Sequence, residues 1–482
     1  MCKPNQFVAG TLFMLVLGLV GCAVGPDYQR ATDVTSAAWK EALPTGWKEA
    51  TPQDDIAKGN WWEIFGDPVL NDLETQATTA NESLKAAVAR VIQARAIARA
   101  KEADFLPQVD FNPSAIRSQQ SAHRPVEPGS KDTNYTANTF SVPFDLSYEL
   151  DIWGKVRRAF EAASADAQAS VAAYETILLT LKSDVAQTYY NLRYIDEELA
   201  ILRNNIEVLK KSLDLVLVRY RGCIASGLDV SQAETLLAST QAQYIGLGRQ
   251  RAQLEHALAV LVGKSTPEFS ITEKPLNNVS PAIPPGLPSD LLERRPDIAE
   301  AERGMAASNA RIGVAKAAFF PSIYLTGNAG QLSVDLSSLT SGQSFTWFVG
   351  PSICLPVFEG GRLSANLKRT RASYDESVAD YRQHVLVAFQ EVEDALAGLR
   401  ILENQAVAQA RAVQAAQRTR EISTSRYKQG AALYLEVLDA QRAVLENEQL
   451  AAQIHGLQLI TSVQLVKALG GGWQASNTNP DR

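Results

Sequence analysis

Two segments of the chain carry apolar residues at alternating positions. The segment NTFSVPFDLSYELDI, residues 138–152, has an apolar side chain at every second position from its third residue onward, and FTWFVGPSICLPV, residues 345–357, has a similar pattern. This period of two predicts β-strands with one apolar face. Each is long enough to cross a bilayer at a tilt, for which about 9–11 residues suffice. Weaker strand signals at 107–117 and 321–332 supply the expected partners.

Most of the remaining chain is predicted to be helical. No proline interrupts residues 155–220 or 362–427, and at about 1.5 Å per residue each run would form a helix about 100 Å long. Each run is followed by a short hinge and a second helical segment. After the first hinge, apolar residues recur at spacings of three and four, as in a coiled coil. Helices with such narrow apolar seams need neighbouring helices to cover them.

The chain is a tandem repeat. RYRGCIASGLDVSQAE, residues 219–234, is matched without a gap by RYKQGAALYLEVLDAQ, residues 426–441. Residues 67–109 likewise resemble 295–323, and each segment begins with a proline at the first helical position. Each repeat thus contains strand, strand, long helix, hinge and returning helix. The expected divisions are a leader at 1–21, an extended lipid-anchored strap at 22–60, repeat 1 at 61–266, a proline-rich linker at 267–295, repeat 2 at 296–470 and a disordered tail at 471–482.

The N-terminus has the form of a lipoprotein leader. Lys3 precedes an apolar stretch, and LVGC at residues 19–22 has the form of a lipidation box. Cleavage would leave Cys22 as the first residue, carrying the lipid. The stretch, about fourteen residues, is too short for a helix that spans about 30 Å of hydrocarbon. In a Gram-negative bacterium, Ala23 rather than aspartate after the cysteine favours the outer membrane by the lipoprotein sorting rule.

Four membrane strands per chain cannot close a barrel, because about eight is the smallest number that does. Open strand edges in lipid leave costly unpaired amides, so the chain must oligomerise. Two copies give eight strands and a filled lumen, whereas three give twelve and room for a channel; cyclic symmetry is compatible with the threefold ring and does not exclude others. The expected fold class is mixed: a membrane β-barrel, with four strands per chain and twelve per trimer, continued by a long α-helical coiled-coil barrel.

Composition and charge exclude several classes. The net charge of −7 argues against nucleic acid as a partner, because an acidic chain repels phosphate. GKST at 263–266 lacks the earlier glycine of a phosphate loop, since Leu258 stands there, and the four histidines show no metal-ligand spacing. Glu391 in QEVED is expected on a charged helix exterior rather than in hydrolysis, and Trp61 and Trp62 in packing rather than on a ligand. We therefore expect no enzyme activity, cofactor or metal site.

Several stretches together give the chain a specific resemblance. They are CAVGPDY (22–28), WWEIFGDPVLNDL (61–73), ELDIWGKVRRA (149–159), GLPSDLLERRPDIAEAE (286–302), LPVFEGGR (355–362), AFQEVEDAL (388–396) and LVKALGGGW (465–473). In this order they resemble the outer-membrane efflux lipoproteins of the TolC-like superfamily, especially the OprM-like branch that serves tripartite resistance-nodulation-division pumps. The resemblance implies a homotrimer in outer-membrane lipid, with a helical barrel that tapers to a closed periplasmic mouth. It also implies a periplasmic adaptor and an inner-membrane proton-driven pump as partners, with drugs or other small amphiphiles leaving passively.

The same resemblance assigns the constriction to the second hinge. The matched positions carry a tyrosine that links neighbouring helices, an apolar ring, two acidic rings, a basic partner and, in the first hinge, an acidic residue tied to the neighbouring helix in the closed state. In that order they are Tyr427, Leu435, Glu436, Asp439, Arg442 and Asp229. In a trimer Asp439 would form a ring of carboxylates that attracts cations. Ala432, where some relatives have arginine, and Cys223, where glycine is usual, leave the closing bridge open. By spacing alone, these charges also fit an ordinary solvated helix face.

Two other functions stay open at this point. A duct for type I protein secretion or for metal-ion export would have the same barrel. The alternative of another class is a structural coiled-coil lipoprotein that bridges envelope layers, with strands that pair in soluble sheets. Heat-modifiable trimers that conduct ions in planar bilayers would distinguish a duct from a scaffold.

Overall fold

The computed structural model describes residues 23–29, 40, 59–122, 134–276, 278–283 and 294–471. Cys22, the leader and the tail from residue 472 onward lie outside the described residues. The chain forms two compact units: unit 1 contains residues 1–31, 91–170 and 301–381, and unit 2 contains residues 32–90, 171–300 and 382–482. Each unit takes segments from both repeats, so the spatial division cuts across the repeats. Among the helices of the described part, none combines the length and hydropathy that a transmembrane helix requires.

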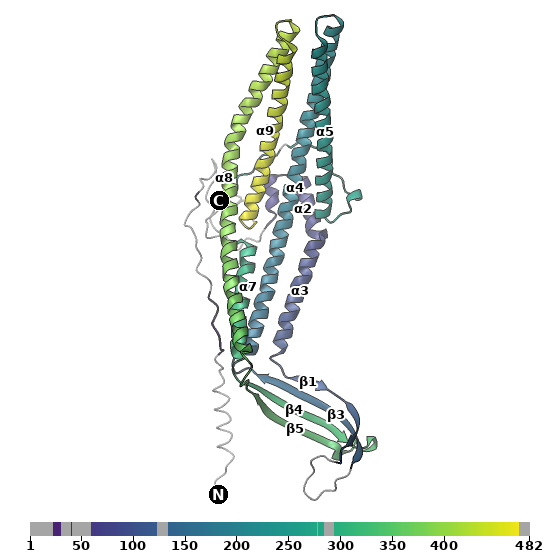
Figure 1. Ribbon diagram of the computed structural model, residues 1–482, viewed down its shortest axis with the longest axis vertical. Helices are drawn as coiled ribbons and strands as arrows, with labels where there is room; N and C mark the ends of the chain where they lie inside the picture. The colour runs from purple at the N-terminus through teal and green to yellow at the C-terminus, as the bar shows by residue number, and fades with distance from the viewer. Residues whose placement is uncertain are drawn as a thin grey trace, which may run out of the picture. The chain divides into compact units, whose positions relative to one another are not determined.

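Unit 1 contains an antiparallel sheet with the strand order β1-β3-β4-β5, in which β2 also pairs with β3 (Figure 1). The strands are β1 (Gln108–Phe111), β2 (Ser114–Gln120), β3 (Tyr135–Leu150), β4 (Ser322–Ser333) and β5 (Phe345–Cys354). β1 and β2 pair with β3 in one continuous register. They act as one strand interrupted at Pro113, which has no amide hydrogen to donate. The strand expected at 107–117 is therefore broken and extends to residue 120, while the other three lie within three residues of their expected bounds.

The register sorts the side chains of the sheet onto two chemically different faces, because side chains alternate along each strand. The apolar face carries Val109, Phe111, Phe144, Leu146, Leu325, Trp347, Val349 and Ile353. The polar face carries Asp110, Ser141, Asp145, Ser147, Thr326, Asn328, Thr346 and Ser352. Strands of this kind are typical of a membrane barrel, with lipid on one side and a polar lumen on the other.

The long helices of the two repeats have identical lengths. α4 (Lys155–Arg221) and α8 (Arg362–Lys428) have 67 residues each, and α5 (Gly227–Leu261) and α9 (Tyr434–Ala468) have 35 each. The bounds of α8 and α9 lie 207 residues after those of α4 and α5, which is also the offset between the two hinge sequences. The uninterrupted runs expected at 155–220 and 362–427 are each a single helix that ends one residue later.

The segment 67–109 forms two helices before β1, where one was expected. The shorter helices of the chain are η1 (Trp61–Phe65), α2 (Pro68–Ala80), α3 (Glu82–Ala103) and α7 (Pro296–Ala317), with single turns at η2 (Thr266–Glu268), η4 (Leu336–Ser338) and η5 (Gly342–Ser344). Asp67 caps α2 and Asn81 caps α3, each by accepting hydrogen bonds from first-turn amides. α3 has the 22-residue length of α7 and begins 214 residues before it. The match of Pro68 with Pro296 was therefore wrong: α3 is the counterpart of α7, and α2 has none.

The tryptophans expected in packing lie in the core of unit 2. Trp61 and Trp62 are buried, with ring centroids 5.9 Å apart in an edge-on arrangement. The amine of Lys182 in α4 lies 4.5 Å from the Trp62 ring, within range of a cation–π interaction. The segment that follows the N-terminal strap is thereby packed onto α4.

Buried charges fasten the first part of the proline-rich linker to unit 2. The fully buried carboxylate of Asp196 in α4 accepts hydrogen bonds from Arg251 Nε at 2.7 Å and from the Lys274 amide at 3.1 Å. Arg251 also donates to the carbonyl of Ile271 at 2.6 Å. Removing one member of such a buried network leaves another unpaired, which is strongly destabilising.

Candidate functional site

Both hinges lie at the same end of unit 2 (Figure 1). The first hinge comprises residues 222–226, between α4 and α5, and the second comprises residues 429–433, between α8 and α9. Gly430 turns the second hinge with a φ of 76°, and its repeat counterpart Cys223 has a φ of 57°, the one positive φ of a non-glycine residue in the described part of the chain. This left-handed conformation costs a residue with a Cβ atom about 1–2 kcal/mol. The cysteine therefore occupies a position that favours glycine.

The two hinges differ in how the following helix begins. In the first, Ser226 Oγ accepts from the Asp229 amide at 3.2 Å, and Asp229 Oδ2 accepts from the Ser226 amide at 2.9 Å, which is a capping box. The counterparts in the second hinge are Leu433 and Glu436, and Leu433 makes no side-chain cap. Glu436 instead pairs with Arg426 at 3.3 Å. The carboxylate of Asp229 is thus used within its own hinge.

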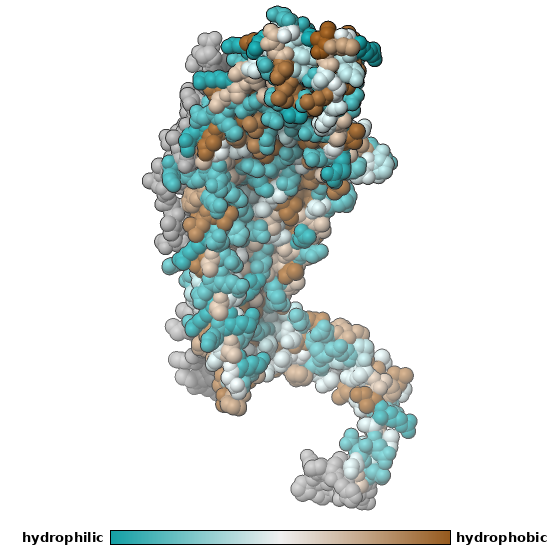
Figure 2. All heavy atoms as spheres, turned by 45° about the horizontal axis from the view of Figure 1, so that its top comes forward, coloured by the Kyte–Doolittle hydropathy of each residue, from teal (hydrophilic) through white to brown (hydrophobic). Residues whose placement is uncertain are grey.

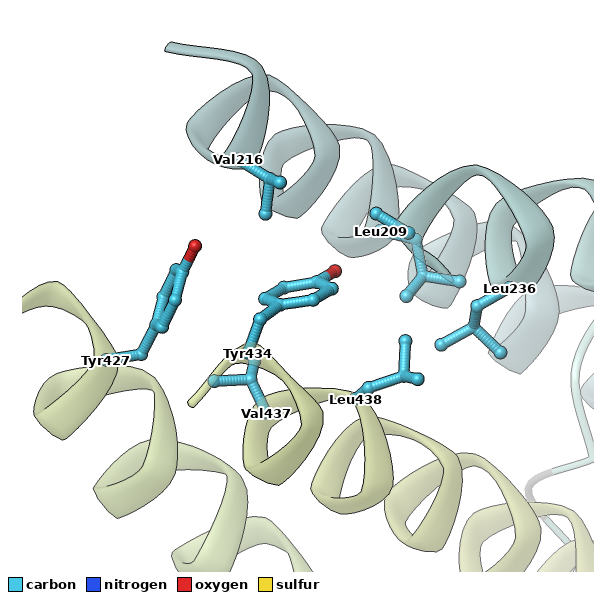
Figure 3. Packing of buried hydrophobic residues seen from close by; sticks show 8 residues of the cluster. Leu209, Val216, Leu236, Tyr427, Tyr434, Val437 and Leu438 are labelled. Carbon is cyan, nitrogen blue, oxygen red and sulfur yellow. The ribbon is translucent and has the colours of Figure 1, made fainter. Parts of the chain in front are cut away.

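Tyr427 lies in a hydrophobic cluster that joins the two helical hairpins (Figure 3). Its side chain is only 5% exposed, and its ring centroid lies 5.4 Å from that of Tyr434. The guanidinium of Arg219 in α4 lies 4.5 Å from the Tyr427 ring and donates to the carbonyls of Tyr427 at 3.1 Å and Lys428 at 3.3 Å. The buried members of the cluster are Leu209, Val216, Ala233, Leu236, Tyr427, Tyr434, Val437 and Leu438. Arg219 therefore binds the end of α8 from the first repeat.

The hydroxyl of Tyr427 is buried without a hydrogen-bond partner among the described atoms. Burial raises the pKa of Tyr427, the charge of Arg219 opposes this shift, and the charge of Asp229 adds to it. The hydroxyl of Tyr427 therefore stays protonated and uncharged, and the negative charge of Asp229 contributes to this. This arrangement brings together two residues that the sequence assigned to different hinges.

Leu435, Asp439 and Arg442 form an exposed stripe on α9. Leu435 is 48% exposed and the Asp439 side chain 65% exposed. Arg442 Nη1 lies 3.9 Å from Asp439 Oδ1, and such exposed pairs contribute about 0–1 kcal/mol to stability. The first-hinge counterparts of Asp439 and Arg442 are the uncharged Gln232 and Thr235. The helical hairpin therefore folds without these charges.

Sequence reasoning missed the residues that hold the second hinge from the first repeat. Besides Arg219, Ser212 in α4 lies with its Oγ 3.3 Å from the Tyr434 hydroxyl and accepts from Gln441 Nε2 at 3.2 Å. The available signal was the arginine that precedes the tyrosine in both hinge sequences. Arg219 acts through its contact with the end of α8 in the other repeat. The spacing of residues within one hinge sequence does not reveal a contact between repeats.

Exposed apolar side chains flank the hinges. Ile224 and Leu228 of the first hinge region and Leu433 of the second are each about two-thirds or more exposed. Figure 2 looks obliquely onto this end of unit 2 and shows hydrophobic side chains among polar ones.

Comparison with known proteins places the chain in one family. The family model described as outer membrane efflux protein matches residues 73–264 and 287–471. The chain is similar to the probable efflux pump outer membrane protein TtgC of Pseudomonas putida, with 36% identity over 98% of this chain and 96% of TtgC. It is also similar to the cation efflux system protein CusC of Escherichia coli O6:H1, with 33% identity over 96% of this chain and 98% of CusC.

Solved structures agree with this assignment. The outer-membrane channel OprN matches with a TM-score of 0.86 at 31% identity, over 94% of this chain and 100% of that chain. The CmeC outer membrane channel of Campylobacter jejuni matches with a TM-score of 0.85 at 28% identity, over 94% and 96% of the two chains. The resemblance, the outer-membrane location and the mixed fold of β-barrel and helical barrel inferred from the sequence are confirmed. The chain belongs to the outer membrane efflux protein family.

Proposed function

We propose that this outer-membrane efflux channel is a homotrimeric duct that the second hinge closes at rest. The observation that carries the proposal is the asymmetry between the hinges. Asp439 and Arg442 stand where the first repeat has uncharged residues, although both hairpins have the same lengths. Charges that the fold does not require, on an exposed stripe beside a turn, are expected to serve the passage.

The sheet supports the trimer. One edge is formed by β1 and β2 and the other by β5, and both edges need partners in lipid. If β1 and β2 count as one strand, three chains supply twelve strands, enough to enclose an aqueous lumen. The apolar face of the sheet then meets lipid, and the polar face lines the lumen.

The contacts of the second hinge support the closed state. In a trimer Leu435 forms an apolar ring and Asp439 a ring of three carboxylates, which repel one another unless a cation or a basic group bridges them. Arg219 and the Tyr427 cluster hold the end of α8 against α4. Opening requires the second hairpin to move away from this contact.

The family resemblance implies the partners, and the exposed apolar residues at the hinges offer them a contact surface. A periplasmic adaptor that links the channel to an inner-membrane resistance-nodulation-division pump would cover Ile224, Leu228 and Leu433. The channel itself is passive, and the pump supplies the energy for drugs or other small amphiphiles to leave.

Single-channel conductance in planar bilayers tests the gate. We expect low conductance from the wild type and at least several-fold higher conductance from the double variant Leu435→Ala with Asp439→Ala, which removes both rings. The matched control is Leu228→Ala with Gln232→Ala at the equivalent positions of the first hinge, which should leave conductance low.

The outcomes separate the parts of the proposal. Equal conductance of the wild type and the gate variant would place the gate elsewhere and leave the duct standing. Protein that forms no heat-modifiable trimer and never conducts would support the structural lipoprotein instead.

A further inference from the structure

One row of side chains crosses the polar face of the sheet from edge to edge. The register sets Asp110 of β1 opposite Asp145 of β3, Asp145 opposite Asn328 of β4, and Asn328 opposite Phe348 of β5. We call these four residues the lumenal row. Two carboxylates, an amide and an aromatic ring thus lie side by side on the face that lines the lumen.

The two carboxylates are costly neighbours. Like charges directly opposite each other on antiparallel strands destabilise a sheet. Two amides offset part of this cost, because Asn112 Nδ2 donates to Asp145 Oδ2 at 3.0 Å and Asn328 Nδ2 donates to Asp145 Oδ1 at 2.6 Å. The sheet thereby holds Asp145 in a fixed orientation beside Asp110.

The second repeat shows that the hairpin does not need these carboxylates. β1 begins one residue after Pro107 and β4 one residue after Pro321, so Tyr324 is the counterpart of Asp110. The residue opposite Tyr324 in β5 is Ser352. The same cross-strand position thus accepts tyrosine and serine in the same sheet, and the acidic pair has a reason other than folding.

No other charge of the polar face cancels the acidic pair. Its remaining carboxylate in the described strands, Glu149, pairs with Lys155 at 2.9 Å, and no lysine or arginine lies on this face of the described strands. Three chains would therefore present the lumen with six carboxylates that no basic side chain of this face neutralises. Such a ring favours cations over anions.

Phe348 adds an exposed aromatic ring to the two carboxylates of the lumenal row. It is 59% exposed on a face that carries mostly polar residues, together with Ile116, Tyr324 and Leu332. Lipid contact does not explain Phe348, because its neighbours Trp347 and Val349 occupy the apolar face. Among the apolar side chains of this face, Phe348 is the one in the same cross-strand row as the two carboxylates. An aromatic ring beside carboxylates suits an organic cation, which gains attraction to the ring as well as to the charge.

We propose that the lumenal row is a selectivity determinant for cationic amphiphiles inside the barrel, separate from the gate. Passing organic cations contact Asp110 and Asp145 through their charge and Phe348 through their apolar part. The inference rests on the proposed trimeric duct and names the class of cargo that the duct favours.

The reversal potential of the open channel tests the carboxylates. The background is Leu435→Ala with Asp439→Ala, which opens the proposed gate and removes its Asp439 ring. Glu436 is the same in every variant, so a difference in cation preference between variants arises from the lumenal row. In about 0.1 M salt, where charges act over about 10 Å, Asp110→Asn with Asp145→Asn should lower the cation-to-anion permeability ratio about fivefold, the factor that corresponds to about 1 kcal/mol. Asp110→Tyr with Asp145→Ser, which copies the pair of the second hairpin, should give the same fall in the permeability ratio.

The control is Asp335→Asn, which removes a carboxylate beyond the end of β4. It should leave the permeability ratio unchanged.

Block of the open channel by tetraphenylphosphonium tests the aromatic ring. Phe348→Leu should weaken block several-fold and leave the permeability ratio for small ions unchanged, whereas Phe345→Leu on the apolar face should change neither. Conducting channels whose ratio and block are the same in all variants would overturn the lumenal row and leave the duct intact. Failure of every variant, the background included, to conduct would instead overturn the duct, and the lumenal row with it.

Discussion

Arg219 connects the two repeats at the second hinge. Its side chain stacks on Tyr427 and donates to two carbonyls at the end of α8. The last carbonyls of a helix have no partner within the helix, and a positive charge there also matches the helix dipole. One side chain therefore both caps α8 and fixes it to α4.

Replacement of Arg219 should loosen the second hinge. In Arg219→Gln the cation–π contact and the charge-assisted hydrogen bonds are lost, at a local cost of about 1–2 kcal/mol. We expect higher resting conductance and faster hydrogen exchange at residues 427–433. Arg221→Gln removes an exposed arginine from the same helix end and serves as the control. Unchanged exchange in Arg219→Gln would show that the cluster holds α8 without the arginine.

For single residues, the sequence predicted the exposed stripe on α9 better than the buried contacts of Arg219 and Tyr427. Leu435 and Asp439 are exposed as a ring requires, because spacing on a helix is sufficient to place them on one side. The resemblance implies that Asp229 is tied to a neighbouring helix in the closed state, which stays a prediction; within the chain its carboxylate caps its own helix. The charge of Asp229 also raises the pKa of Tyr427. This effect depends on how the two hairpins pack together, which cannot be read from the sequence around either residue.

Among the elements, the proline-rich linker is more firmly held than its composition suggests. His455 in α9 has Nε2 2.7 Å from the carbonyl of Asn278 and Nδ1 3.7 Å from a carboxylate oxygen of Glu197 in α4. The nearby carboxylate of Glu197 raises the pKa of His455, burial opposes this shift, and the contact with the Asn278 carbonyl adds to it. The linker thus has a contact that responds to pH.

Attachment of the linker should weaken as the pH rises. Because the folded pKa of His455 lies above its usual value of about 6.5, the added stability is fully present below that value and is lost as the pH rises through the raised pKa. Hydrogen exchange at residues 278–283, corrected for its intrinsic pH dependence, should increase between pH 6 and pH 8. His455→Gln keeps a donor but does not titrate, so its exchange should not follow this trend. The same trend in both proteins would assign the effect to another group.

Long, uniform elements were predicted well, and short interruptions were not. The strict alternation of β3 and the absence of proline in α4 and α8 located these elements closely. The break between α2 and α3 was missed because Asn81 lies within an otherwise continuous helical pattern, although asparagine is favoured as an N-cap. The interruption between β1 and β2 could have been read from Pro113, which cannot donate to the strand ladder.

The whole molecule depends on the two faces of the sheet meeting different surroundings. A lysine on the lipid face near the bilayer midplane costs about 2–4 kcal/mol, and one on the lumenal face costs little. Leu146 and Ser147 are adjacent in β3 and lie on the apolar and polar faces. We expect Leu146→Lys to reduce the yield of heat-modifiable trimer in the outer membrane and Ser147→Lys to retain it. Equal yields would indicate that this sheet does not meet lipid.

The equal lengths of the paired helices restrict how this protein can change. Removing one residue from α4 would shorten it by about 1.5 Å and rotate everything beyond by about 100°, while α8 stayed as it is. In the proposed trimer, Leu435 and Asp439 of the second hinge would then no longer lie level with the residues of the first hinge. Substitutions can accumulate independently in either repeat, whereas insertions and deletions in these helices must arise in matched pairs. The sequence of each helix is therefore free to vary by itself, whereas its length can change only together with that of its counterpart.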